Sequence, residues 1–268
     1  MKGKAQGSHL FTMAVLLFGL VLSGCVTTTD SRFSREADRD KAVSNYVQLA
    51  TAYIGQGNLD RARHHLERAL ELSPNSSEAL AAMGLVYNAE GEPELAERNF
   101  KRAISQDSSY SRARVYYGAF LYSNGRFSEA RDQFSVASRD TGYRERGAVF
   151  YNLGMTEERL GNLDAAAGAY RRAVELTRGE ARTLLSLSRV LVEQEDFTEA
   201  SRYYSRLQTM IQRNTRLSHS AESLYTGILI ARHFNDRDQE VSLAMLLRND
   251  YSNSLEYQQY RVLIANDR

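Results

Sequence analysis

The sequence predicts an all-α fold, a right-handed superhelix of about six helical hairpins followed by a C-terminal capping helix. Three observations lead to this fold class. The chain has only two prolines and no tryptophan, and 43% of its residues are hydrophobic, a composition typical of a helical globular protein. Small and aromatic residues recur at an interval of 34 residues, and a glycine recurs at one point of each period. An interval of this length is the mark of stacked helical hairpins.

Four positions carry the interval most clearly. The recurring sets are Ala50, Gly84 and Gly118; Ala62, Ala96 and Ala130; Leu66, Phe100 and Phe134; and Ala69, Ala103 and Ala137. Small residues allow the two helices of a hairpin to approach closely, aromatic residues fill the gap to the next hairpin, and glycine ends the first helix. This is the pattern of the tetratricopeptide repeat, which also favours a proline near its end, as at Pro74.

The first 24 residues have the features of an export signal. Lys2 and Lys4 precede an apolar run from Leu10 to Leu22, which is too short to span a membrane but suits a secretory signal. The run ends in Leu22-Ser23-Gly24-Cys25, which resembles the lipobox of bacterial lipoproteins. That resemblance implies that the signal is cleaved before Cys25 and that this cysteine is acylated. An ordinary signal peptide with a chance cysteine is the alternative.

Residues 25–40 are predicted to form a lipidated, flexible tether, because they are polar and rich in threonine and charge. The solenoid is then predicted over residues 41–268. Residue Val26 follows the cysteine and Thr27 comes next, so no aspartate stands where it would retain a lipoprotein in the inner membrane. We therefore expect a protein anchored by lipid to the periplasmic face of the outer membrane.

The repeats follow one another through the rest of the chain. We predict them over residues 43–76, 77–110, 111–144, 147–180, 181–214 and approximately 220–253. The sixth is degenerate around Gly227, with a second helix through Val241–Arg248. The segment from Tyr251 to Arg268 is amphipathic and is predicted to be the capping helix.

No enzyme, metal centre or cofactor is predicted. Glu157-Glu158 and Glu193-x-Glu195 are the only acid–base pairs of interest, and solvated helix ends explain them better. Cleavage of the signal would remove Lys2 and Lys4 from the 34 basic residues and none of the 33 acidic ones, which argues against a nucleic-acid partner. We predict that the function resides in a protein-binding surface.

First helices line the groove of tetratricopeptide arrays, and the residues at their groove positions mix apolar side chains with arginine. Such a mixture suits a peptide or strand ligand, although several of these aliphatic residues could instead pack between neighbouring helices. The predicted groove residues are Val47, Ile54, Leu85, Arg112, Tyr122, Tyr151, Met155, Arg159, Leu185 and Arg189.

A lipobox followed by about six such repeats resembles the PilF/PilW family of type IV pilus biogenesis lipoproteins. The resemblance is carried by Tyr46–Ala62, by Ala82–Asn88 and by Tyr117–Phe127, and it extends over nearly the whole chain. It implies a pilotin, which binds subunits of the secretin and promotes their localisation to the outer membrane and their multimerisation.

Other functions remain open on the sequence. An adaptor lipoprotein that scaffolds peptidoglycan hydrolases would share both the lipobox and the repeats and would differ only in its ligand. A lipoprotein of β-barrel assembly fits the first and third repeats less well, and an enzyme fits least.

Overall fold

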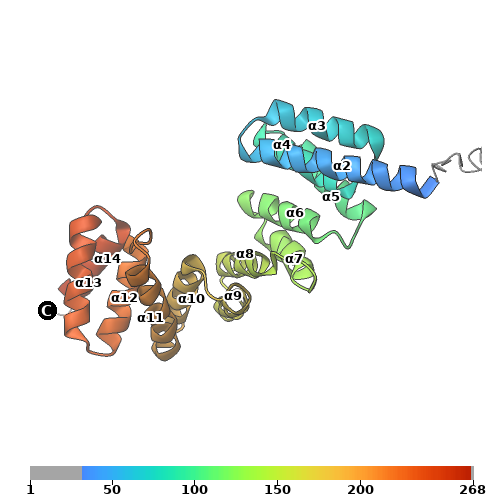
Figure 1. Cartoon of the computed structure of the whole chain (residues 1–268). Helices are drawn as coiled ribbons and strands as arrows, with labels where there is room; N and C mark the ends of the chain where they lie inside the picture. Colours follow the sequence, from blue (N-terminus) through green and yellow to red (C-terminus); the bar gives the residue numbers. More distant parts are fainter. Residues whose placement is uncertain (1–31, 267–268) are drawn as a thin grey trace, which may run out of the picture. The chain divides into compact units, whose positions relative to one another are not determined.

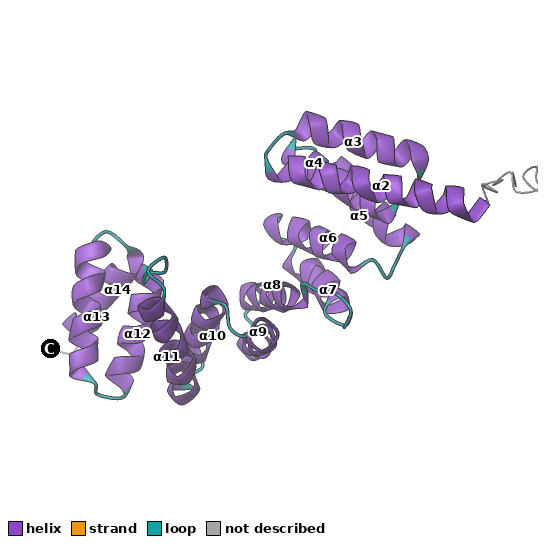
Figure 2. Ribbon diagram, viewed as in Figure 1, coloured by secondary structure: helices purple, strands orange, loops and turns teal. Residues whose placement is uncertain are grey.

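The structure is a computed structural model that describes residues 32–266, all of whose regular secondary structure is helical (Figures 1 and 2). The predicted signal peptide and Cys25 lie outside the described residues. Six hairpins and a final helix follow one another along the chain. Their helices are α2 (Arg32–Gly55), α3 (Leu59–Leu72), α4 (Ser77–Ala89), α5 (Pro93–Gln106), α6 (Ser111–Ser123), α7 (Phe127–Ala137), α8 (Arg146–Arg159), α9 (Leu163–Thr177), α10 (Ala181–Glu193), α11 (Phe197–Arg213), α12 (Ala221–His233), α13 (Arg237–Asp250) and α14 (Leu255–Ala265). The predicted fold class is confirmed.

Helix α2 begins earlier than the sequence pattern predicts. Residues 32–40, which were expected to belong to the tether, form its first turns, and residues 35–40 are exposed. This stretch contains no glycine or proline, and its charges are spaced to support a helix. The Arg39 guanidinium lies 3.7 Å from Glu36, three residues earlier on the same face of the helix. The chain divides into two units after Ala42, and the hydrophobic core lies in the second, residues 43–268.

We call the first helix of each hairpin helix A and the second helix B. Within a hairpin, the small residue of helix A faces the large residue of helix B. A Cβ atom added to Gly118 would lie 2.7 Å from the Phe134 ring, and one added to Gly154 would lie 2.6 Å from the Tyr170 ring. The first hairpin pairs Ala50 with the smaller Leu66 instead, and both are fully buried. The recurring small residue therefore sets how closely the two helices approach.

The turn between helices A and B uses left-handed backbone in every hairpin. The first four hairpins place glycine there, at φ angles of 73°, 80°, 75° and 77°. The fifth uses Glu195 (φ 61°) and the sixth uses Asn235 (φ 58°). Glycine adopts this conformation without steric cost and asparagine tolerates it, whereas glutamate is strained in it.

The sixth hairpin departs from the spacing of the first five. In the first five hairpins the small residue precedes the left-handed turn residue by seven positions, but in the sixth that place holds the fully buried Ile228. Ala244, on helix B, stands where the other hairpins have a large residue, so the facing small and large residues lie one position earlier on both helices. Gly227, on which the prediction was centred, is the small residue that faces helix B, since a Cβ atom added to it would lie 2.8 Å from Cδ1 of Leu243. It also faces the preceding hairpin, where the same Cβ atom would collide with the Tyr204 hydroxyl.

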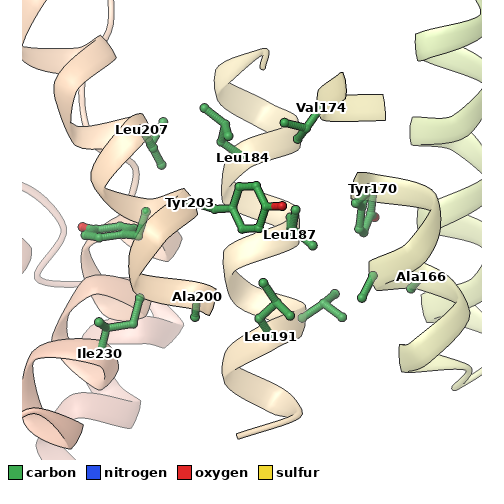
Figure 3. Close-up of a cluster of buried hydrophobic side chains, with 13 residues drawn as sticks. Ala166, Tyr170, Val174, Leu184, Leu187, Leu191, Ala200, Tyr203, Leu207 and Ile230 are labelled. Atoms are coloured by element: carbon green, nitrogen blue, oxygen red, sulfur yellow. The ribbon is translucent and has the colours of Figure 1, made fainter. Parts of the chain in front are cut away.

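Buried side chains form a continuous series of clusters between successive helices. Figure 3 shows one of them, in which Leu184, Leu187 and Leu191 of α10 lie between residues of α9, such as Tyr170, and residues of α11, such as Tyr203. Because each hairpin buries its apolar face only against its neighbours, the array is stable as a whole.

Candidate binding surface

A depression on the second unit is formed by α2, α4, α6 and the loops before α6 and α8. It has a volume of about 580 Å³ and mixes apolar, hydroxyl and charged side chains. Two of the predicted groove residues, Val47 and Arg112, line it. We call it the tyrosine depression, after Tyr110 and Tyr143, and its other lining residues are Ser44, Gln48, Thr51, Glu78, Asp107, Ser109, Ser111, Asp140 and Gly142.

Two loops of the same design carry the tyrosines. Asp107 accepts a hydrogen bond from the Ser109 amide at 2.8 Å, and Asp140 accepts one from the Gly142 amide at 2.9 Å. In each loop the tyrosine amide then donates to the aspartate carbonyl, at 3.3 Å for Tyr110 and 3.2 Å for Tyr143. These local turns place both tyrosines at the same point of successive hairpins.

The electrostatics of the tyrosine depression keep its phenols neutral. Burial, together with the Glu78 carboxylate, raises the pKa of Tyr110. Burial, together with Glu145, also raises the pKa of Tyr143. The Arg112 guanidinium lies 3.9 Å from Glu145, and its side chain is 45% exposed. The depression thus presents protonated hydroxyl groups and a half-exposed arginine to solvent, which suits a polar peptide.

A small apolar notch lies between α6 and α8. It has a volume of about 90 Å³ and is lined by Ala119, Tyr122, Phe134, Asn152 and Met155. At its edge, Arg159 Nε donates a hydrogen bond to the Tyr122 hydroxyl at 3.2 Å, and the Tyr122 ring lies edge-on to Phe127 with centroids 5.2 Å apart. The structure therefore brings together three predicted groove residues, Tyr122, Met155 and Arg159.

Arg189 is occupied within the chain. Its guanidinium is ion-paired to Glu158, to Glu193 at 2.7 Å and to Glu222 at 2.8 Å. The Tyr170 hydroxyl donates to the same Glu158 at 2.5 Å. Three carboxylates on three helices thus enclose one guanidinium, so this predicted groove residue joins α8, α10 and α12 instead of pointing to an open surface.

The remaining predicted groove residues differ in their exposure. Ile54, Leu85 and Leu185 are half-buried against the core clusters, as the packing alternative allowed. Tyr151 is half-buried, with its ring 5.6 Å from that of Tyr170 and with the Arg182 guanidinium 4.6 Å above it.

The candidate acid–base pairs serve structural roles. Glu157 is buried and accepts a hydrogen bond from Asn162 at 2.8 Å, whereas the neighbouring Glu158 is bound to Tyr170 and Arg189. Glu195 occupies the left-handed turn. Within residues 32–266, no group of three or more His, Cys, Asp or Glu side chains is placed to hold a metal ion.

Tyr110 and Tyr143 were not among the predicted groove residues, because the repeat motif points only to positions on helix A. The sequence nevertheless contains a pattern that could have identified these two tyrosines. Asp107-Ser-Ser-Tyr110 and Asp140-Thr-Gly-Tyr143 repeat the same pattern in two loops between hairpins. None of the helices that the structure describes is both long enough and apolar enough to cross a membrane.

The sequence was compared with known families and proteins. Models of the tetratricopeptide repeat match residues 41–109, 81–144 and 137–181. The chain is 34% identical over 248 residues to the type IV pilus assembly protein PilF of Pseudomonas aeruginosa. The alignment covers 92% of this chain and 96% of that protein.

Two solved structures resemble the fold. That of Pseudomonas aeruginosa PilF matches with a TM-score of 0.74 at 33% identity, over 84% of this chain and 99% of that one. That of PilW, described as a widely conserved type IV pilus biogenesis factor, matches with a TM-score of 0.65 over 81% of this chain and 97% of that one. At 20% identity, the likeness to PilW shows the fold alone.

Proposed function

This chain belongs to the PilF family of tetratricopeptide-repeat proteins of type IV pilus biogenesis, and from that premise we propose that it is a pilotin. In this role it binds subunits of the pilus secretin and promotes their localisation to the outer membrane and their multimerisation. It is a protein-binding scaffold and not an enzyme. The observation that carries the proposal is the alignment with PilF along nearly the whole chain.

The surface of the second unit supports a peptide or strand as the ligand. The notch between α6 and α8 offers an aromatic ring, a thioether and, at its edge, an exposed arginine, and these residue types are enriched at the centres of protein interfaces. The tyrosine depression adds hydroxyl groups that can bind backbone carbonyls of an extended segment.

Lipid attachment at Cys25 completes the proposal. Acylation of this cysteine would hold the solenoid at the periplasmic face of the outer membrane, where secretin subunits multimerise. The resemblance of Leu22–Cys25 to a lipobox supports this anchor.

Deletion of the gene tests the function. We expect the heat-stable secretin multimer to fall, the secretin monomer to remain detectable and surface pili to be lost, and expression of the intact chain should restore all three. Normal secretin multimers with altered cell-wall cleavage would instead support the hydrolase adaptor. If multimers and pili are both unchanged, the chain is not the pilotin.

A further inference from the structure

The last helix B, α13, exposes several apolar side chains. Val241 is 57% exposed and Met245 is 51% exposed. Counted from the left-handed turn of each hairpin, the place of Met245 is taken in the five earlier hairpins by Glu67, Lys101, Ser135, Arg171 and Ser205. The earlier second helices expose at most one large aliphatic residue each, at Leu72, Val136 and Leu176, whereas α13 exposes Val241, Met245 and Leu246. Such a concentration on one helix indicates a contact surface.

These apolar residues belong to a stripe with charged ends. Asp238, Val241, Met245 and Arg248 follow one another at spacings of three, four and three residues, so they lie along one face of α13. All four are exposed. The stripe is symmetric about Leu243, with an acid at one end, a base at the other and the two apolar residues between them.

We propose that the stripe is the contact between two copies of this chain, with their α13 helices antiparallel across a two-fold axis. A crossing centred on Leu243 places Val241 opposite Met245 of the second copy. The same crossing places Asp238 opposite Arg248 of the second copy. The two-fold axis repeats each pair, so one surface complements itself in both shape and charge.

Charge complementarity selects a second copy over other occupants. Within the part of the chain that the structure describes, neither Asp238 nor Arg248 forms an ion pair or hydrogen bond through its side chain, so both are available. An anionic membrane surface would favour a stripe that is basic at both ends. This stripe has an acid at one end and a base at the other, so it is complementary in charge to a second copy in the antiparallel orientation.

The contact is modest in size. It uses one helix from each copy, with Leu246 (43% exposed) at its edge. Such an area is below that of an obligate dimer, so the association is reversible and depends on concentration. It leaves the tyrosine depression and the notch, which lie on α2 to α8, available for a partner.

Disulfide crosslinking in membranes tests the register. Two full chains with different epitope tags are co-expressed, one carrying Val241→Cys and the other Met245→Cys, and the membranes are oxidised. We expect a dimer that contains both tags, in excess over dimers of either single tag. Ser201→Cys with Ser205→Cys, at the same positions of α11, is the matched control and should not crosslink. The unsubstituted chain controls for Cys25.

Charge reversal tests the ionic pair in the same assay. Asp238→Arg in both chains should lower the yield of the mixed dimer about tenfold, as should Arg248→Asp in both. The two changes together should restore it, because the pair is re-formed with opposite sign. The proposal would be overturned if no mixed dimer formed, or if single-tag and mixed dimers formed in equal yield. It would also be overturned if the double change did not restore the yield. The proposal would also be overturned if the charge reversals left the mixed dimer unchanged and abolished only a crosslink to a different envelope protein.

Discussion

Gly84 and Phe100 meet with no room for a side chain between them, since a Cβ atom on Gly84 would lie 2.6 Å from Cε1 of Phe100. The Phe100 side chain is fully buried and also packs against Tyr117 and Phe120 of the next hairpin, so its ring cannot move aside freely. This contact joins helices A and B of the second hairpin and connects that hairpin to the third.

Gly84→Ala is therefore expected to destabilise the solenoid. The added methyl group overpacks the hairpin, which costs about 1–3 kcal/mol of unfolding free energy. Urea unfolding followed by circular dichroism measures the change. Gly168→Ala is the control, because a Cβ atom there meets no neighbour within 4 Å and alanine favours a helix. Equal stability of the two variants would contradict this account of the small residue.

Glu195→Gly is expected to stabilise the protein. Glu195 has a φ angle of 61° at the position where the first four hairpins have glycine. Relief of this left-handed strain outweighs the greater entropy of glycine in the unfolded chain and leaves a gain of roughly 0.5–1 kcal/mol. The melting temperature should rise. Gly125→Ala should lower it, because it introduces the same strain, and a change of the same sign in both variants would refute the explanation.

Glu97 is expected to make stability depend on pH in the acid range. Hydrogen bonds from Arg126, with Lys101 and Tyr117 contributing, lower the pKa of this carboxyl from 4.5 to about 2, although burial opposes the shift. A folded-state pKa below the unfolded value stabilises the protein above pH 4.5, and this contribution is lost as the pH falls from about 4.5 to about 2.

Glu97→Gln tests this dependence. The variant should be less stable than the parent at pH 7, and the difference in unfolding free energy should shrink as the pH approaches 2. Urea unfolding at several pH values measures it. Glu94→Gln, an exposed position on the same helix, should leave the slope unchanged. A constant difference between Glu97→Gln and the parent at every pH would show that the ionised carboxylate is not responsible.

Cys25→Ser is expected to release the protein from the membrane fraction without unfolding it. Lipid chains stabilise anchoring by about 0.8 kcal/mol for each buried CH₂ group, so removal of the acylation site removes the anchor. Fractionation of cell envelopes after a high-salt wash measures the release. Cys25→Ala should behave in the same way. Full retention of the serine variant in the outer membrane would exclude the proposed lipid anchor.

Tyr122→Ala and Met155→Ala are expected to weaken secretin capture. Both side chains line the notch between α6 and α8, and loss of either should reduce affinity by about tenfold, or about 1.4 kcal/mol. Helical content should be unchanged. Phe234→Ala removes a half-exposed ring of the sixth hairpin and serves as the control. Equal weakening by all three variants would indicate that the notch is not the site.

The sequence by itself determined the helical class and the spacing of the hairpins, because the interval of 34 residues reflects packing between neighbouring helices. Ala96, Phe100 and Gly84 each meet neighbours within one or two hairpins, so a periodic constraint on residue size is visible without coordinates. In the sixth hairpin Gly227 and Leu243 keep the spacing of the small and the large residue, but the left-handed turn residue Asn235 follows Gly227 by eight positions and not by seven.

The tertiary structure alone decided which candidate side chains are free. Arg189 and Arg159 are both arginines on first helices, yet the first is enclosed by carboxylates from three helices and the second lies exposed beside Tyr122. The difference depends on Glu222 of α12, which is 33 positions beyond Arg189. Ion pairs and surface depressions are made by residues distant in the chain, so their occupancy follows from three-dimensional distances and not from the identity of the residue.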